Sequence, residues 1–327
     1  MIDASVIIVS YNVRDLLLRC LESVRAATVS YNAEVFVVDN GSRDGTVERV
    51  REQFPDVILI TNQANRGFGA ANNQAIARAR GRAVLLLNCD AELHPDALDT
   101  MLRYLVENVD VGVIGPRLFY PDGRTQSSRR RFPTPLIAMV ESTRLQTWWP
   151  NCPLLNRYYR NDGSDDEIQD VDWLVGACLL VRREVIETVG WFDERFFMYS
   201  EELDLCRRVR SAGWRVVYLP TARAIHHEGR SSEQNLAQRA QNFHESKCRY
   251  FEKYSGQSTA RALRIFLLTN TLLDLGEESI KFALGHRREL RRARIASLAK
   301  VACYQLRRLA AHSEATVGML ARGASCE

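Results

Sequence analysis

The sequence predicts an α/β fold in which a largely parallel sheet carries helices on both faces. Two observations support this prediction. Short aliphatic or β-branched runs alternate with segments of helical periodicity through the first hundred or so residues, as in 83–88 followed by 95–108. Both kinds of segment have the lengths that βαβ units require, and such units cover a parallel sheet on both faces.

The expected elements follow one another in a regular order. The first four strands are 5–11, 34–40, 57–62 and 83–88, and their helices are 14–27, 45–54, 69–80 and 95–108, with Pro95 at the start of the last. After an apolar run at 111–120 and a hairpin turn at 121–124, residues 125–170 are expected to be irregular. The later elements are a strand at 172–183, a short helix at 184–190, a helix at 201–213 closed by Gly213, a strand at 214–220, and helices from about residue 232.

Composition narrows the class of protein further. Hydrophobic residues make up 46% and charged residues 26% of the 327-residue chain, which is a globular composition. The net charge of +4 is too small to argue for a nucleic-acid partner. Eight dispersed cysteines without a C-x-x-C pair favour a reducing compartment. With neither a signal peptide nor an apolar run approaching ~18 residues expected, we predict a cytoplasmic protein, either soluble or peripheral to a membrane.

Polar residues follow several of the predicted strands at the point where each strand ends. They are Ser10-Tyr11-Asn12, Asp39-Asn40-Gly41, Asn62 and Asn88-Cys89-Asp90. The carboxyl ends of parallel strands meet at one edge of a sheet, which is where α/β proteins bind their ligands. There the carboxylate of Asp39 can accept the N3–H of a pyrimidine base, although a plain turn explains the same residues.

Three further motifs are each ambiguous by themselves. Asp90 suits a hard cation such as Mg²⁺ or Mn²⁺, or it is a strand-end surface residue. Residues 65–73, "NRGFGAANN", place Arg66 and Asn72 near a ribose or phosphate, or form a glycine-loosened helix start. The pair His226-His227 lies in an extended segment, so at most one of the two faces a given site.

A cluster of acids marks the start of the helix predicted at 201–213. Glu201, Glu202 and Asp204 fall within one turn. Acids at this position stabilise a helix through its dipole, and one of them could also act as a general base.

The order of these motifs carries more information than any one of them. "SYN", "VDNGSRDGT", "NRGFGAANN", "LLLNCDAEL", "WLVGACLLVRREV", "GWFDERFFMYSEELDLCRRVRSAGWRVVYLP" and "IHHEGRSS" resemble glycosyltransferase family 2, and "RRRFPTP" resembles its bacterial rhamnosyltransferases. The likeness covers residues 4 to about 250. It implies a GT-A domain over 1–256 around a mixed sheet, with a Rossmann-like nucleotide-binding half at about 1–110 and an acceptor-binding half at about 111–256. Residues 257–327 are then a basic amphipathic helical extension.

The resemblance also implies roles for individual residues. Ser10, Tyr11 and Asn12 would line the base and ribose, Asp39 would bind the pyrimidine, and Asn65, Arg66, Gly67 and Asn72 would close the nucleotide pocket. Asp90 would bind the metal with His226. Asn88, which stands where many members carry a first Asp, would belong to the nucleotide-binding residues. Asp172, Trp173, Gly176 and Ala177 would form the acceptor floor. Glu202 would be the catalytic base, with Asp204 as the alternative.

These roles imply an inverting transfer that depends on Mg²⁺ or Mn²⁺. The donor expected is a nucleotide sugar, dTDP-rhamnose before other UDP- or GDP-sugars. The acceptor expected is a hydroxyl of a glycan or lipid-linked saccharide in bacterial cell-surface polysaccharide synthesis. A pseudoenzyme that binds nucleotide sugars without turnover is the non-catalytic alternative, which the carboxylates at Asp90 and Glu202 argue against.

The C-terminal extension is rich in arginine. Basic residues in 287–308 greatly outnumber acids, of which Glu289 is the one present, and apolar positions interleave with them at Leu290, Ile295, Leu298 and Val301. Such a segment is a solvated helix face, a nucleic-acid binder or an interfacial helix on anionic lipid. We favour the lipid surface, at the inner face of the cytoplasmic membrane, and expect no nucleic-acid partner. The sequence assigns no oligomeric state.

Overall fold

The computed structural model describes residues 2–28, 30–144, 148–149, 152–161, 163–228 and 235–323, with side chains described as far as residue 311. The chain divides into two compact units. The first comprises Met1–Phe132 and Asn151–Ser231, and the second comprises Pro133–Pro150 and Ser232–Glu327. The sequence placed the start of the C-terminal extension at residue 257, whereas the second unit already includes the preceding helix and a segment from the middle of the chain.

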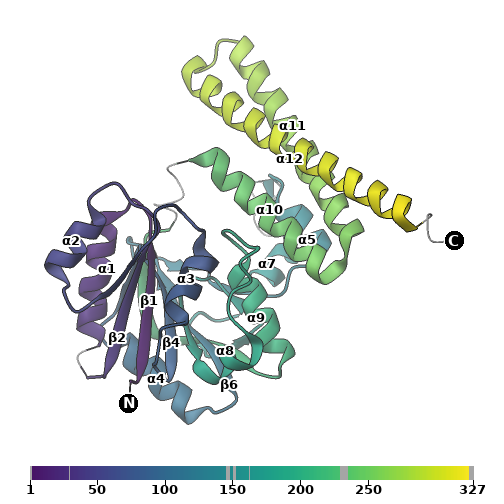
Figure 1. Ribbon diagram of the computed structural model, residues 1–327. Coiled ribbons are helices and arrows are strands. Elements are labelled where there is room, and N and C mark those ends of the chain that lie inside the picture. Colours follow the sequence, from purple (N-terminus) through teal and green to yellow (C-terminus); the bar gives the residue numbers. More distant parts are fainter. Residues whose placement is uncertain are drawn as a thin grey trace. The chain divides into compact units, whose positions relative to one another are not determined.

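The N-terminal half of the first unit is a parallel sheet (Figure 1). Its strands lie in the order β3-β2-β1-β4, with bounds Ile58–Thr61, Ala33–Asp39, Ala4–Ser10 and Ala83–Asn88. Ser10 pairs with Asp39 across β1 and β2, and Val9 pairs with Asn88 across β1 and β4. This register places the polar ends of these strands side by side, as the sequence predicted.

The same sheet continues with strands of both directions. β11 (Cys178–Arg182) runs antiparallel to β4 and to β6 (Val111–Phe119), and β6 runs parallel to β12 (Arg215–His226). β5 (Ala91–Leu93) and β9 (Gln169–Val171) pair antiparallel with β12, and β7 (Thr125–Gln126) pairs with β6. The sheet is therefore mixed, and the predicted fold class is confirmed.

Helices cover both faces of the sheet because the apolar residues of its strands alternate in direction. Val6 and Ile8 of β1 belong to one buried cluster and Ile7 and Val9 to another. The first cluster includes residues of α1, α2 and α4, with bounds Arg14–Ala27, Thr46–Gln53 and Ala97–Glu107. The second includes residues of α3, α8 and α9, with bounds Phe68–Ile76, Arg183–Val189 and Glu201–Ser211. The sheet is the shared wall of two cores.

The structure corrects the strand predicted at 172–183. Trp173–Leu174 form β10, which pairs with β8 (Arg129–Arg130) outside the main sheet, and Cys178–Arg182 form β11. Residues 175–177 between them are not a strand. Gly176 lies here against the start of α9, so packing interrupts a segment that its apolar pattern alone would extend.

The segment expected to be irregular contains short elements within its described residues. Besides β7, β8 and β9, it includes α5 (Pro135–Glu141) and α7 (Pro153–Tyr158). Thr134 begins α5, because its side chain accepts a hydrogen bond from the Ile137 amide and a proline follows at the first helical position.

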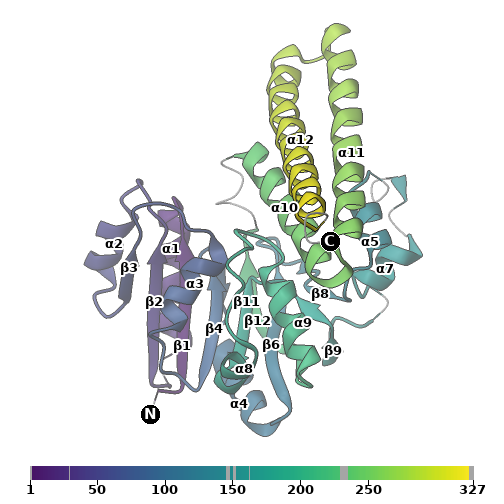
Figure 2. The ribbon, with the colours of Figure 1, turned by 45° about the vertical axis from the view of Figure 1, so that its right-hand side comes forward.

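Long helices make up most of the second unit (Figure 2). α10, α11 and α12 span Leu236–Ser255, Gln257–Ala283 and Arg288–Gly323, and α11 and α12 pack along one another as a helical hairpin. No helix among the described residues is long and apolar enough to cross a membrane.

Candidate active site

Asp39 ends β2 with one carboxylate oxygen fully engaged. Its Oδ2 accepts the backbone amides of Gly41, at 3.1 Å, and Ser42, at 2.9 Å. Gly41 has a φ of +86°, and a Cβ there would lie 3.2 Å from the Ala64 backbone, so glycine is required for this turn. Oδ1 of Asp39 is buried and has no hydrogen-bond partner among the described residues. It is an acceptor that suits the N–H of a ligand.

Ser10 and Asn12 flank this carboxylate with different roles. Ser10 is fully buried, and its hydroxyl also lacks a partner among the described residues. Asn12 adopts a φ of +52°, its amide N–H donates to the Ser42 hydroxyl at 2.9 Å, and its side-chain oxygen accepts the Arg43 amide at 2.8 Å. Tyr11 is half-buried between them. Asn12 thus ties the end of β1 to the loop after β2, which positions the loop that holds Asp39.

The predicted nucleotide loop folds onto the segment that leads to the candidate base. The Phe68 amide donates to the Phe197 carbonyl at 2.7 Å, and a Cβ at Gly67 would lie 2.5 Å from the same oxygen. Asn65 accepts the Gly67 amide at 2.9 Å. Asn72 is buried and donates to the Phe68 carbonyl, whereas Arg66 is exposed. Asn65 and Asn72 shape the loop through these hydrogen bonds, and Asn65 and Arg66 are both exposed.

Asn40 is a site residue that the sequence analysis did not single out. It is 2% exposed, and its amide nitrogen donates to the Asn65 side chain and the Gly67 carbonyl. Its amide oxygen accepts a hydrogen bond from Asn62 at 3.0 Å. Asn40 therefore fixes the nucleotide loop next to Asp39. Its place directly after the Asp39 strand end was the signal that could have identified it.

The two predicted metal ligands face one another. His226 lies opposite Ala91 in the β12–β5 pairing, which brings its Nε2 to 3.3 Å from Oδ1 of Asp90. Both residues are 5% exposed, and the Asn88 amide nitrogen is 3.4 Å from the same Nε2. His227 points away from them and contacts Glu92 at 2.7 Å. The two adjacent histidines therefore contact different carboxylates, and His226 is the one beside Asp90.

These groups suit a divalent cation that is shared with a ligand. The described residues contain no cluster of three or more His, Cys, Asp or Glu side chains that could hold a metal ion. A cation here would therefore depend on further oxygen ligands, which is the usual situation where Mg²⁺ binds with substrate phosphates. One carboxylate and one imidazole form a donor pair that fits Mn²⁺ or Mg²⁺ on those terms.

Glu202 stands at the first turn of α9, which has a strained entry. Tyr199 and Ser200 both have positive φ angles, of 70° and 63°, an uncommon backbone for residues other than glycine. Oε2 of Glu202 is buried and lacks a partner among the described residues, as does Oε2 of Glu201. Burial raises the pKa of both carboxyls, and the charge of Glu202 raises the pKa of Glu201 further. A carboxylate with a raised pKa is a suitable proton acceptor.

Asp204, the alternative base, has a different environment. It is fully buried, and its Oδ2 accepts a hydrogen bond from Nε of Arg208 at 2.9 Å. Arg208 in turn donates to the Val189, Gly190 and Trp191 carbonyls. Asp204 thus holds α9 to the preceding loop, which favours Glu202 as the base.

The residues predicted for the acceptor floor divide into two pairs. Gly176 lies against Glu202, where a Cβ would be 3.3 Å from the Glu202 side chain, and the Ala177 carbonyl accepts the Asn88 amide at 2.9 Å. These two residues connect the end of β4 to the candidate base. Asp172 accepts the Phe132 amide, and the Trp173 indole donates to the Arg131 carbonyl. The polar atoms of that second pair therefore hold the strap at 130–132.

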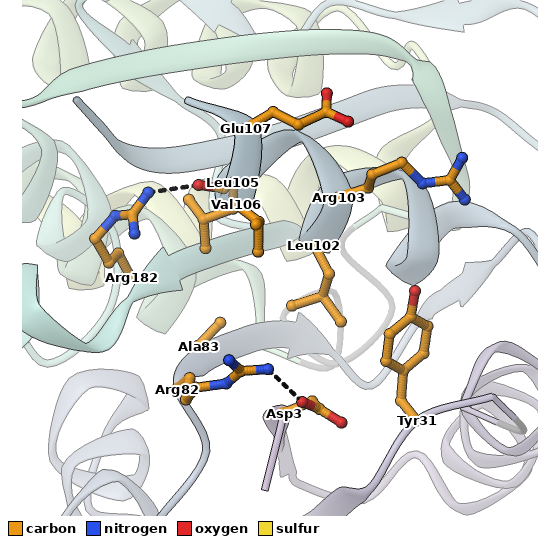
Figure 3. A pocket seen from close by; sticks show the side chains of 10 residues that line it. All are labelled: Asp3, Tyr31, Arg82, Ala83, Leu102, Arg103, Leu105, Val106, Glu107 and Arg182. Carbon is orange, nitrogen blue, oxygen red and sulfur yellow. Dashed lines mark hydrogen bonds and ion pairs between the residues drawn. The ribbon is translucent and has the colours of Figure 1, made fainter. Parts of the chain in front are cut away.

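A cavity of about 380 Å³ lies at the other end of the strands (Figure 3). Asp3 precedes β1, Ala83 begins β4 and Arg182 ends the antiparallel β11, so this is the amino end of the parallel strands. Arg82 pairs with Asp3, and Arg182 donates to the Leu105 carbonyl. Because these lining residues lie at the amino ends of the parallel strands, the cavity is separate from the site at the carboxyl ends.

The mixed sheet and the C-terminal helices have the architecture of the GT-A glycosyltransferases. The model for glycosyl transferase family 2 matches residues 5–190, and the chain belongs to this family. It is a glycosyltransferase whose relatives include bacterial rhamnosyltransferases. The predicted family is therefore confirmed.

Two relatives and one solved structure illustrate this likeness. The chain is 34% identical over 252 residues to the N-acetylglucosaminyl-diphospho-decaprenol L-rhamnosyltransferase of Mycobacterium tuberculosis, covering 74% of this chain and 81% of the relative. It is 30% identical to the rhamnosyltransferase WbbL of Escherichia coli, covering 69% and 85%. The mannosyltransferase PcManGT of Pyrobaculum calidifontis, solved with GDP-Man and Mn²⁺, superposes with a TM-score of 0.51 at 18% identity over 94% of this chain and 89% of that one. That superposition supports the GT-A fold.

Proposed function

We propose that this glycosyltransferase transfers rhamnose from dTDP-rhamnose to a hydroxyl of a lipid-linked saccharide in cell-surface polysaccharide synthesis. The two rhamnosyltransferases similar to this chain support the sugar, and the printed name of the mycobacterial one supports a diphospho-polyprenol saccharide as acceptor. The observation that carries the proposal is a group of buried oxygens that lack a hydrogen-bond partner among the described residues. They are the Ser10 hydroxyl and Oδ1 of Asp39 at the ends of β1 and β2, and Oε2 of Glu202 in the first turn of α9.

The nucleotide-sugar donor would bind beside these unpartnered oxygens. Oδ1 of Asp39 would accept the N3–H of a thymine or uracil base, since a carboxylate can only accept hydrogen bonds. Ser10, Tyr11 and Asn12 would line the base and ribose, and the loop at 65–67 with Asn72 would close over them. The sugar diphosphate would then extend toward Asn88 and Asp90.

Asp90 and His226 would hold Mg²⁺ or Mn²⁺ with the diphosphate oxygens. When bound, the cation would neutralise the charge that develops on the departing nucleoside diphosphate. The chain supplies the remaining chemistry. Glu202 would take the proton of the acceptor hydroxyl while its oxygen attacks the anomeric carbon from the face opposite the diphosphate, which inverts the configuration. Gly176 packs against Glu202, where a Cβ would lie 3.3 Å from its side chain, so a glycine at 176 leaves room for this carboxyl.

The donor assignment is tested by incubation with Mg²⁺ or Mn²⁺ and a panel of UDP-, GDP- and dTDP-sugars, with release of the nucleoside diphosphate as readout. Release from dTDP-rhamnose in the presence of a polyprenyl-diphosphate saccharide is the expected result. A preference for a GDP-sugar would contradict the role of Asp39, and binding without release from any donor would indicate a pseudoenzyme.

We also propose that the second unit binds the anionic inner face of the cytoplasmic membrane. Of the four apolar positions that the sequence analysis named on this extension, Leu290 is exposed, Ile295 and Leu298 are half-buried, and Val301 is buried. Arg291, Arg294 and Arg308 make ion pairs with Glu278 or Glu245 instead of remaining available to lipid. Exposed apolar side chains lie on α11 and its C-terminal end, at Ile265, Leu272, Leu273, Ile280 and Leu284.

These apolar positions suit an interfacial helix. Residues 273, 280 and 284 fall on one side of α11 by helical spacing, and Leu284 is 80% exposed. Arg287, Arg288 and Arg292 follow and are exposed, so an apolar face ends in a basic group. Full-length protein with Leu273→Asp and Ile280→Asp should lose pelleting with vesicles rich in anionic lipid. The matched control is Val106→Asp with Val109→Asp, which alters exposed apolar residues of the first unit. Equal pelleting of both double variants and the wild type would contradict the proposal.

A further inference from the structure

Gln126 lies behind the predicted metal ligand His226. It is in β7, which pairs with β6, and its side chain is buried at 6% exposure. Oε1 of Gln126 is 2.9 Å from Nδ1 of His226, and Nε2 of Gln126 is 2.9 Å from Oε2 of Glu228. Gln126 thus joins His226 and Glu228, two residues a hundred positions further along the chain, in one hydrogen-bonded row.

The chemistry of this row allows one arrangement of protons. The carboxylate of Glu228 can only accept, so the amide nitrogen of Gln126 must face it and donate. The amide oxygen of Gln126 therefore faces His226, and because that oxygen can only accept, Nδ1 of His226 must carry a proton. In a neutral imidazole the other nitrogen, Nε2, then bears the lone pair.

The Nε2 atom lies beside the other predicted metal ligand, Asp90. Nε2 lies 3.3 Å from Oδ1 of Asp90 and 3.4 Å from the amide nitrogen of Asn88. Asn88 can donate to Nε2, which is consistent with a lone pair at that atom. Two electron-rich atoms, Nε2 and a carboxylate oxygen, are therefore held next to each other, as in a ligand pair for a cation.

We propose that Gln126 is a positioning residue that, together with Glu228, holds His226 in its Nδ1–H tautomer and so presents Nε2 to the divalent cation beside Asp90. This inference rests on the metal site of the proposed function. Gln126 touches neither donor nor acceptor in this scheme, and it acts through the imidazole.

His227 provides an internal contrast. Its Nε2 contacts the Glu92 carboxylate at 2.7 Å, so this imidazole donates from Nε2 and carries the opposite tautomer when neutral. The two adjacent histidines thus have opposite tautomers. Glu92 acts directly on His227, whereas Glu228 acts on His226 through the amide of Gln126. Glu92→Gln is therefore a matched control for substitutions in the Gln126–Glu228 pair.

The experiment uses two readouts on the full-length protein. Long-range ¹H–¹⁵N NMR of ¹⁵N-histidine-labelled protein without metal reports the tautomer of His226, which should be Nδ1–H in the wild type. Electron paramagnetic resonance of Mn²⁺ in the presence of dTDP reports cation affinity. Gln126→Leu should shift His226 toward the Nε2–H tautomer and weaken Mn²⁺ binding by about 10- to 100-fold, the usual effect of losing an outer partner of a metal ligand.

A swap guards against a simple folding defect. In Gln126→Glu with Glu228→Gln, the new carboxylate accepts from both His226 and the new amide, so the Nδ1–H tautomer and Mn²⁺ affinity should be retained. Glu92→Gln should leave the His226 signals and Mn²⁺ affinity unchanged.

The metal site and the positioning role of Gln126 are overturned by different results. Absence of Mn²⁺ binding by the wild type with dTDP would overturn the metal site itself, and the inference with it. Mn²⁺ binding and an Nδ1–H tautomer that both persist in Gln126→Leu would overturn the role of Gln126 while leaving the metal site intact. Loss of affinity in Gln126→Leu with an unchanged tautomer would also contradict it.

Discussion

Buried carboxylates have opposite environments in the two units of this protein. In the first unit, Asp39, Glu201 and Glu202 each keep a buried oxygen without a hydrogen-bond partner among the described residues. In the second unit, Glu245 pairs with Arg264 and Arg308. Paired carboxylates hold helices together, whereas an unpartnered buried oxygen costs stability and indicates a place where a ligand or proton is expected.

The pKa directions show the same contrast. Burial alone would raise the pKa of Glu245, but Arg308 and Arg264 outweigh it and lower the pKa to about 2. Burial and then the charge of Glu202 raise the pKa of Glu201. Burial is opposed by two arginines at Glu245 and reinforced by a second carboxyl at Glu201, so the two pKa values shift in opposite directions.

The largest expected effect is on turnover, when the carboxyl of Glu202 is replaced. Glu202→Gln keeps the shape of the side chain but removes the proton acceptor, so turnover should fall by about 10²- to 10⁴-fold. Affinity for the nucleotide sugar should change little, because a base acts in the transition state. Steady-state kinetics and calorimetric donor binding measure the two quantities. Turnover near the wild-type value would show that Glu202 is not the base.

The same substitution at two other glutamates should change stability in opposite directions. Glu245→Gln leaves Arg264 and Arg308 without their carboxylate and should lower the free energy of unfolding by about 2–3 kcal/mol, less than for a fully buried pair because Glu245 is only half-buried. Glu201→Gln removes a carboxyl whose ionisation is disfavoured by burial and by Glu202, and should raise the free energy of unfolding at pH 7. Urea unfolding at pH 7 compares them, and destabilisation by both would contradict the contrast.

The pH dependence of stability should distinguish Glu245 from Glu201 and Glu202, with smaller effects than the substitutions. The folded pKa of Glu245 lies below its unfolded value, so its stabilising contribution is present above about pH 4 and is lost as pH falls toward 2. Glu201 and Glu202 have raised pKa values, so they favour the folded state at low pH, and that contribution is lost as pH rises through those values.

Catalysis should follow the raised pKa of Glu202. Because the base must be ionised, kcat/KM should fall with decreasing pH along a limb that lies above the ordinary glutamate value of about 4.3. A pH–rate profile measures this limb. A limb at or below the ordinary value would remove the argument that burial tunes this carboxyl.

The parallel half of the fold was predictable because its signals are local. The strand runs 5–11 and 83–88 are apolar throughout, and each is followed by a helical pattern, so periodicity alone identified β1 and β4 and the edge where they end. The strand predicted at 172–183 was wrong because its interruption comes from Gly176 packing under Glu202, a contact with a distant helix. Local pattern contains no trace of such a contact.

The site was predictable to the extent that its residues end strands or begin helices. Asp39, Asp90 and Glu202 stand at such positions. Gln126 is a hundred positions from its partner His226, in a two-residue strand without an apolar pattern, so only the β6–β7 hairpin beside β12 shows its contact. The sequence analysis listed Asn40 among the polar strand ends but assigned a role only to its neighbour Asp39.

Binding of dTDP in the presence of Mn²⁺ tests the central claim most directly, namely that unpartnered buried carboxylate oxygens mark the donor site. Calorimetry should compare wild type with Asp39→Asn, which keeps the shape of the side chain but loses the charge, and with Glu245→Gln under conditions where each is folded. The account predicts a loss of about 10- to 100-fold in affinity for Asp39→Asn, the worth of one hydrogen bond to a charged group, and unchanged affinity for Glu245→Gln. Equal affinity of Asp39→Asn and the wild type for dTDP would contradict it.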